Sequence, residues 1–272
     1  MTSTRPPGNK TGLVTEGCYA APLYDCDGCP TTREHYISEN LLERFGESFT
    51  IQGVPWSLNP KLVGSGSLTA KILCERHNNS PSALDTMIGL FYDVLREALR
   101  GSQVGDHDYD GEDLERWAMK LMFGIAASGN VSYPGVGRVV ARRIPVEHLR
   151  VLFGEAELPE GCGLKYVGAP VPGLEDPSRI SYAINNSVDV DQVAVGITIK
   201  ILNCFQFMTS IVGLATPVAR WGDVHLLHRP GGFVLGVGER ECGQVRLRWG
   251  GKLTERGLLI LRYEQSFATC RI

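Results

Sequence analysis

Apolar residues recur at helical spacing in two runs between residues 81 and 129. Their steps of three and four residues match one face of an amphipathic helix. These positions are Leu84, Ile88, Phe91, Leu95 and Leu99, then Leu114, Trp117, Leu121 and Ile125. Ser80-Pro81 suits the start of the first helix, and Gly101 suits its end. We predict that a polar, acidic loop over residues 105–111 separates the two helices.

Residues 131–272 carry a different pattern, which is typical of β-strands. Apolar residues alternate strictly from Val193 to Ile201, so we expect one face of a strand there to be buried. Glycine-rich turns and prolines separate further apolar runs. These predicted strands are residues 233–235, 245–249 and 258–263. The pattern predicts a mainly antiparallel β region.

Together, the patterns predict an α+β protein. The segment up to about residue 80 is turn-rich and contains a cluster of cysteine and histidine residues. The two amphipathic helices follow it, and the β region follows them. We expect a first domain over residues 13–130 and a β-rich second region over residues 131–272, whose role the sequence does not assign. A single α+β unit is the alternative organisation.

Two pairs of residues in the N-terminal segment share the spacing of metal ligands. Cys26 and Cys29 are separated by two residues, and so are Cys74 and His77. Gly28 eases a tight turn that would let both thiolates of the first pair face one ion. The four residues form a Cys₃His set, which suits structural zinc. For the first pair alone, redox chemistry is a competing interpretation. For Cys74 and His77, the competing interpretation is a buried thiol and a surface histidine that bind no metal.

The composition indicates the cellular compartment and limits the kinds of partner that we expect. Of the 272 residues, 43% are hydrophobic and 21% are charged, which is ordinary for a soluble globular protein. We find no secretory signal or membrane span, and we expect a cytoplasmic protein whose paired cysteines bind metal rather than form disulfides. The net charge of −3 argues against a broad nucleic-acid surface. Any such contact would be local, through Arg138, Arg142 and Arg143. The alternative interpretation is that these arginines form a solvent-exposed face without a nucleic-acid partner.

Polar residues that suit metal-dependent hydrolysis accompany the two pairs. Glu34 and His35 lie between the pairs, and Asn78 and Asn79 follow the second pair just before a predicted helix. A metal-polarised phosphate and a water activated by histidine are sound phosphodiester chemistry. The start of the helix would also favour a phosphate group. We therefore consider these four residues a candidate catalytic set.

The motifs Cys-x-x-Cys, Glu-His and Leu-Cys-x-x-His-Asn-Asn, in this order, resemble the HNH family of ββα-metal or treble-clef nucleases, including uncharacterised bacterial HNH-like proteins. The resemblance covers roughly residues 23–85. It implies a zinc-stabilised ββα module with His35 as the general base. It also implies that Glu34 and Asn79 bind a catalytic Mg²⁺ or Mn²⁺ ion, with Asn78 as the other candidate ligand. The implied activity is an endonuclease that hydrolyses nucleic acid, with DNA favoured over RNA.

The chain departs from this family at the residue that orients the catalytic histidine. Thr69 stands where the family has its middle asparagine, Ser38 replaces a proline, and His77 replaces the last cysteine. These departures still allow zinc binding. Thr69 in place of asparagine favours an alternative function, in which a non-catalytic zinc-binding module binds nucleic acid or a protein partner. The sequence assigns neither an oligomeric state nor a cutting specificity.

Overall fold

The structure is a computed structural model of the chain. It describes residues 3–133, 137–139, 144–168, 180–186, 194–202, 205–211, 225–250 and 258–263. Within these ranges it is a mixed α and β protein with mainly antiparallel sheets. None of the helices in these ranges has both the length and the apolar character needed to cross a lipid bilayer.

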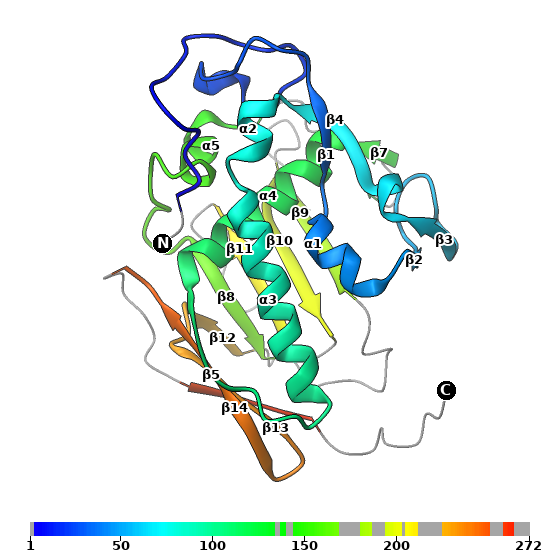
Figure 1. The fold of residues 1–272 in the computed structure, drawn as a ribbon, viewed down its shortest axis with the longest axis vertical. Coiled ribbons are helices and arrows are strands. Elements are labelled where there is room, and N and C mark those ends of the chain that lie inside the picture. Colours follow the sequence, from blue (N-terminus) through cyan, green and yellow to red (C-terminus); the bar gives the residue numbers. More distant parts are fainter. Residues whose placement is uncertain are drawn as a thin grey trace.

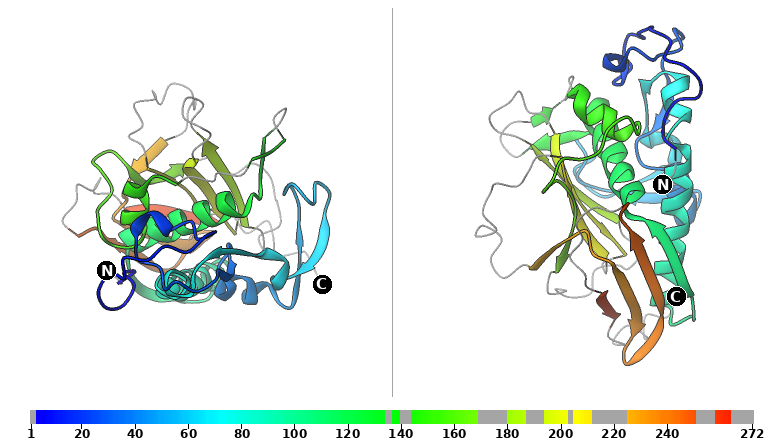
Figure 2. Two further views of the ribbon diagram at one scale, coloured as in Figure 1. Left: turned by 90° about the horizontal axis from the view of Figure 1, so that it is seen from above. Right: turned by 90° about the vertical axis from the view of Figure 1, so that its left-hand side faces the viewer.

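The two long helices predicted from the sequence are present and pack against each other. They are α3 (Ser82–Leu99) and α4 (Gly111–Ser128). The carboxylate of Asp110 caps α4 by accepting a hydrogen bond of 2.9 Å from the backbone N–H of Glu112. Gly129 ends this helix in the left-handed conformation, with φ 69°. Figures 1 and 2 show α4 between α3 and the largest sheet, and its residues from Gly111 to Ala126 are buried.

The largest sheet has five strands, all antiparallel to their neighbours. Its strands, in order, are β12 (His225–His228), β8 (Gly163–Gly168), β11 (Phe205–Ser210), β10 (Ala194–Ile201) and β9 (Ile180–Asn186). The alternation predicted for β10 is confirmed at Ile197, Ile199 and Ile201, which are fully buried. It fails at Val195, which is only half-buried, because an irregularity between Ala194 and Gly196 shifts the register. Val193 lies outside the described residues.

A second sheet has four strands in the order β15 (Leu258–Tyr263), β13 (Gly232–Val237), β14 (Arg240–Arg248) and β5 (Gly105–Asp110). The central pair is antiparallel and both outer pairs are parallel. The loop predicted over residues 105–111 is therefore wrong, because residues 105–110 are the edge strand β5. Charge explains why so polar a segment joins a sheet. Asp108 forms an ion pair of 2.9 Å with Arg248 on β14, and Asp106 forms one with Arg246.

The two regions predicted on either side of residue 130 share this sheet. Strand β5 precedes that boundary and β14 follows it, yet they pair directly. Trp249 also lies so close to Gly111, at the start of α4, that a Cβ atom on the glycine would stand 2.5 Å from the indole ring. One cluster of buried apolar side chains runs through both regions. The described residues of both regions thus pack together as one unit, and the division of the chain into two domains stays a prediction.

The N-terminal part lies across the end of this unit (Figure 1). Strand β1 (Thr32–His35) pairs in antiparallel fashion with β4 (Thr69–Leu73), and α2 (Glu75–Asn79) follows β4. The remaining α-helices and strands are short: α1 (Glu39–Leu42), β2 (Ser48–Ile51), β3 (Lys61–Gly64), β6 (Val131–Tyr133), β7 (Gly137–Val139) and α5 (Val146–Leu152). The pairing of β1 with β4 before α2 is compatible with a ββα module, and the treble-clef assignment stays a prediction.

Candidate metal centre

Three cysteines and one histidine converge in the N-terminal part. The thiol groups of Cys18, Cys26 and Cys74 and a ring nitrogen of His77 all lie within 4.8 Å of one another, and all four residues are buried. The His77 Nδ1 atom lies 3.2 Å from Cys74 Sγ. It lies 3.8 Å from Cys26 Sγ and 3.9 Å from Cys18 Sγ. The group is a Cys₃His set that could hold a metal ion such as zinc.

The spacing of these atoms fits a tetrahedral zinc ion. With Zn–S bonds of about 2.3 Å and Zn–N bonds of about 2.0 Å, a tetrahedron places the nitrogen roughly 3.5 Å from each sulfur. The observed separations between His77 Nδ1 and the three sulfur atoms run from 3.2 to 3.9 Å and bracket that value. The three cysteines are free of disulfide bonds. All three thiols are therefore available as ligands.

Two short helices position the four ligands. Cys74 is the N-cap of α2, and His77 lies three residues later on the same face of that helix. Cys18 and Cys26 flank a short 3₁₀ helix, Ala21–Leu23, in which the N–H of Ala21 donates to the carbonyl of Cys18 over 3.0 Å. The chain thus supplies one ligand pair from a regular helix and one from a turn.

Arg76 holds the two ligand-bearing segments together. Its guanidinium lies 2.9 Å from the carboxylate of Asp25, which is next to Cys26. Its backbone N–H donates to Asp27 Oδ2 over 2.9 Å, and the N–H of Cys29 donates to Asp27 Oδ1 over the same distance. These contacts fix the turn after Cys26 against the start of α2. They orient the ligand-bearing segments in the way that outer-shell partners do at metal sites.

Burial favours the neutral imidazole at this site. It lowers the pKa of His77 to about 4, so the ring is in the form that ligates metals near neutral pH. The ring also lies edge-on to Phe153, with 4.8 Å between the ring centroids. Burial raises the pKa of the Cys18 and Cys26 thiols. A bound metal ion would therefore have to displace their protons.

Cys29 does not lie in this group, and this differs from the predicted ligand set. The residue is exposed, while Cys18 is buried beside Cys26 and takes the fourth place. The turn after Cys26 explains the difference, because Gly28 has a φ of 78° and the chain then leads outward. Cys18 lies outside any cysteine pair of ligand spacing, so the sequence pattern did not single it out. The other three predicted ligands, Cys26, Cys74 and His77, do converge.

The predicted catalytic residues are brought only partly together. His35 ends β1 opposite Thr69 on β4, and its Nδ1 atom lies 3.7 Å from the Glu39 carboxylate. The Asn78 side chain donates to Thr32 Oγ1 over 3.0 Å and to the carbonyl of Arg33, so it ties α2 to β1. Asn79 is exposed at the end of α2.

Glu34 has a buried cationic partner that the sequence did not indicate. Its carboxylate lies 2.7 Å from the ammonium of Lys120 on α4, which also lies 2.6 Å from Asp85 on α3. The hydroxyl of Ser38 donates to Asp85 over 2.5 Å and accepts a hydrogen bond of 2.8 Å from the indole N–H of Trp117. Lys120 occupies an otherwise ordinary helical position in the sequence. Its role depends on tertiary contacts alone.

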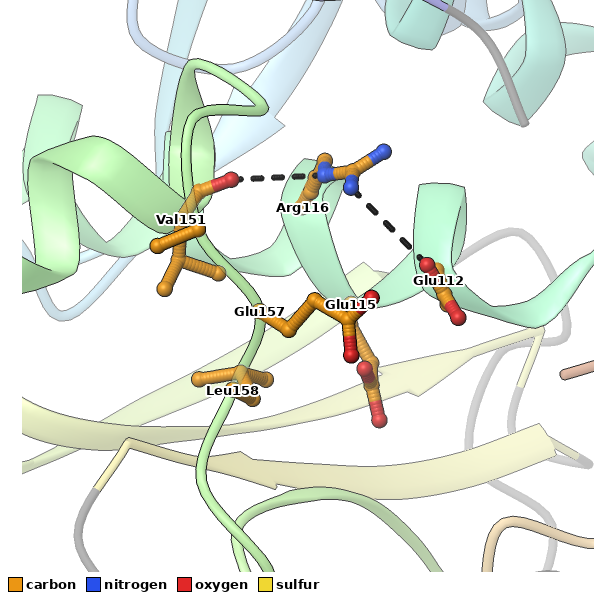
Figure 3. A pocket seen from close by; sticks show the side chains of 7 residues that line it. Glu112, Glu115, Arg116, Val151, Glu157 and Leu158 are labelled. Carbon is orange, nitrogen blue, oxygen red and sulfur yellow. Dashed lines mark hydrogen bonds and ion pairs between the residues drawn. The ribbon is translucent and has the colours of Figure 1, made fainter. Parts of the chain in front are cut away.

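A small pocket beside α4 is also lined by charged side chains. Figure 3 shows Arg116 there, donating to the carbonyl of Val151 over 3.3 Å and lying 3.8 Å from the Glu112 carboxylate. Glu115, from the same lining, forms an ion pair of 2.9 Å with Arg229. Glu112, Glu115 and Arg116 thus each have an ionic partner, which is consistent with a structural role.

Of the three arginines considered for a local nucleic-acid contact, Arg138 lies in β7, and Arg142 and Arg143 lie outside the described residues.

Comparison with known proteins identifies no relative. No family model, no curated protein and no solved structure matches the chain.

Proposed function

We propose that the protein is a zinc-binding protein in which Cys18, Cys26, Cys74 and His77 hold a structural, non-catalytic ion. The observation that carries the proposal is the closed set of four buried protein ligands. Catalytic zinc sites generally keep one position open for water or substrate, whereas structural sites take all four ligands from the protein. When bound, zinc would supply a cross-link between the N-terminal turns and α2.

The surroundings of Glu34 support a non-catalytic role for the neighbouring polar residues as well. Its side chain is buried, and its carboxylate is paired with Lys120. A buried carboxylate that already has a cationic partner is a poor ligand for a second, divalent cation, because binding would require breaking the ion pair. We therefore assign Glu34 to the ion-pair network and not to a magnesium site.

A protein partner is favoured over nucleic acid by the side chains around the metal centre. Leu13, Val14 and Tyr24 are 49%, 56% and 64% exposed. The backbone holds them close to the ligands, because Cys26 N–H donates to the carbonyl of Leu13 and Gly12 N–H donates to that of Tyr24. Exposed apolar groups favour protein association, whereas nucleic-acid binding needs clustered cations. Fluorescence anisotropy with a DNA duplex tests this choice, and a salt-sensitive complex would overturn it.

Metal analysis tests the zinc proposal directly. Purified untagged protein should contain about one zinc ion per chain. Cys74→Ser should lose the ion. The matched control is Cys162→Ser, which changes a buried thiol outside the ligand group and should keep it. A wild-type protein without zinc after expression with the metal supplied would overturn the proposal.

The second candidate is the HNH-like endonuclease. One observation favours it: the Nε2 atom of His35 is buried without a hydrogen-bond partner among the described residues, at the end of a strand that Asn78 ties to α2. A free imidazole nitrogen is what a general base requires. DNA cleavage with Mg²⁺ or Mn²⁺, lost in His35→Ala at unchanged zinc content, would establish this candidate. Absence of cleavage with either ion would remove it.

A further inference from the structure

The second cysteine of the Cys-x-x-Cys motif has no place in the ligand group. Cys26 is fully buried among the ligands, whereas Cys29 is exposed three residues later. The other described cysteines outside the group, Cys162 and Cys242, are buried. Cys29 is thus an accessible thiol that lies three residues after a proposed zinc ligand and is not needed for a four-coordinate site.

Hydrogen bonds link the turn that carries Cys29 to helix α2, which carries two of the ligands. Asp27 accepts hydrogen bonds from the N–H of Cys29 and from the N–H of Arg76, which is adjacent to His77 and Glu75 on α2. Cysteines separated by two residues readily form a disulfide, as they do in dithiol oxidoreductases. Closing that bond here would withdraw Cys26 from the ligand set.

We propose that Cys29 is an oxidation site that opens the metal centre by forming a disulfide with Cys26. The proposal rests on the zinc site proposed above. Its co-reactant is a peroxide, and its result is a chain in which only Cys18, Cys74 and His77 remain as ligands. The feature that distinguishes Cys29 from its neighbours is exposure, because oxidants reach an accessible thiol before a buried one.

The electrons and atoms of this step balance. The Cys29 thiolate attacks one peroxide oxygen, the O–O bond breaks, and Cys29 becomes a sulfenic acid while hydroxide leaves. The Cys26 thiolate then attacks the Cys29 sulfur, an S–S bond forms, the S–O bond of the sulfenic acid breaks, and a second hydroxide leaves. Two protons from solvent convert the hydroxides to water. Two thiolates are thereby oxidised by two electrons, and one peroxide is reduced to two waters.

Loss of Cys26 removes one of three sulfur ligands, so the affinity for zinc should fall steeply. A thiol reductant would cleave the disulfide and restore the fourth ligand. The centre would then bind zinc reversibly according to the redox state of one pair of cysteines.

The test is zinc release from the full-length, zinc-loaded protein treated with hydrogen peroxide, followed with a chromophoric chelator. Wild-type protein should release zinc, and peptide mapping by mass spectrometry should find a Cys26–Cys29 disulfide. Cys29→Ser should start with the same zinc content and release zinc at least about tenfold more slowly, since only buried ligand thiols remain to be oxidised. The matched control, Cys162→Ser, should behave as wild type. Dithiothreitol and added zinc should restore the wild-type site.

Three outcomes would overturn the proposal. One is equal release rates in wild type and Cys29→Ser. Another is release with Cys29 still reduced or with a Cys18–Cys26 disulfide instead. The third is loss of zinc from untreated Cys29→Ser, which would make Cys29 a ligand while leaving the zinc function standing. A wild-type protein that never binds zinc fails earlier, at the proposed function itself, so the two failures are distinguishable.

Discussion

The Sγ atom of Cys18 lies 3.9 Å from the Nδ1 atom of His77, although 59 residues separate the two in the chain. A metal ion between them would close a long loop around β1 and β4. Closing a long loop lowers the entropy of the unfolded chain and so stabilises the folded one. The same link would fix the N-terminal turns to α2, which leads into the long helix α3.

Replacing single cysteines with serine should show whether Cys18 or Cys29 belongs to the ligand set. Cys18→Ser removes a buried sulfur that lies within the group, so zinc content should drop well below that of the wild type. Cys29→Ser changes an exposed thiol and should leave it unchanged. Elemental analysis of both variants, prepared in parallel, checks this. The reverse result would restore the ligand set predicted from the motif spacing.

Removing the metal should loosen the N-terminal turns first. A strong chelator should raise hydrogen exchange at the backbone amides of Gly12 and Cys26, whose hydrogen bonds close these turns. Amides of the inner strand β10 should keep their protection, because that strand is paired on both sides and packs on α4. Exchange mass spectrometry with and without chelator provides the measurement. Uniform deprotection across β10 would mean that the whole fold depends on the metal.

Elements that depend on local patterns were predictable from the sequence. The periodic apolar positions located α3 and α4, and the alternating ones located β10. The partners of Cys26 were predictable only in part. His77 and Cys74 share a helical spacing that a sequence displays, whereas Cys18 reaches the group through the short 3₁₀ helix before Cys26.

Features that depend on distant partners were not predictable. The segment over residues 105–110 contains three aspartates and resembles a solvated loop until Arg246 and Arg248 are placed beside it. Glu34 was considered a metal ligand because its neighbour is a histidine. Its actual partner, Lys120, lies in a helix whose charged residues would ordinarily face water. In both cases the deciding interaction joins segments far apart in the chain.

Lys120→Met should destabilise the protein strongly. The substitution fills similar volume but leaves the carboxylates of Glu34 and Asp85 without the ammonium that lies within 2.7 Å of each. Breaking a buried ion pair from one side costs about 3–5 kcal/mol in the free energy of unfolding. Denaturant titration of wild type and variant measures the difference.

Adding Glu34→Gln to Lys120→Met serves as the control, because it removes one of the two stranded charges. Part of the lost stability should return. A loss of less than about 1 kcal/mol in the single variant would contradict a buried, paired lysine, because that range is typical of surface pairs. Failure of the double variant to recover any stability would point to side-chain packing instead of charge.

The contribution of Lys120 should disappear at high pH. Burial alone would lower the pKa of Lys120, but the carboxylates of Asp85 and Glu34 outweigh it and raise the pKa above the usual 10.5. A folded-state pKa above the unfolded one stabilises the protein fully below pH 10.5, and this stabilisation is lost as the pH rises through the folded value. The difference in unfolding free energy between wild type and Lys120→Met should therefore be constant from about pH 8 to about pH 10 and shrink above that. A difference that grows with pH would contradict the assignment.

Breaking the ion pair between Glu115 and Arg229 from one side should cost far more stability than breaking an exposed pair of similar length. The Glu115 carboxylate lies 2.9 Å from Arg229 Nε, with the two side chains 2% and 4% exposed, and it also accepts the N–H of Leu164 over 2.8 Å. Arg229→Met should cost about 3–5 kcal/mol in the free energy of unfolding, because it leaves a buried carboxylate without its cation.

The matched control is Arg248→Met, which breaks a 2.9 Å ion pair with Asp108. The side chains of Arg248 and Asp108 are 72% and 41% exposed. That change should cost no more than about 1 kcal/mol, since water and salt screen the charges. Equal losses in the two variants, measured by the same denaturant titration, would show that the helix α4 charges are not desolvated in solution.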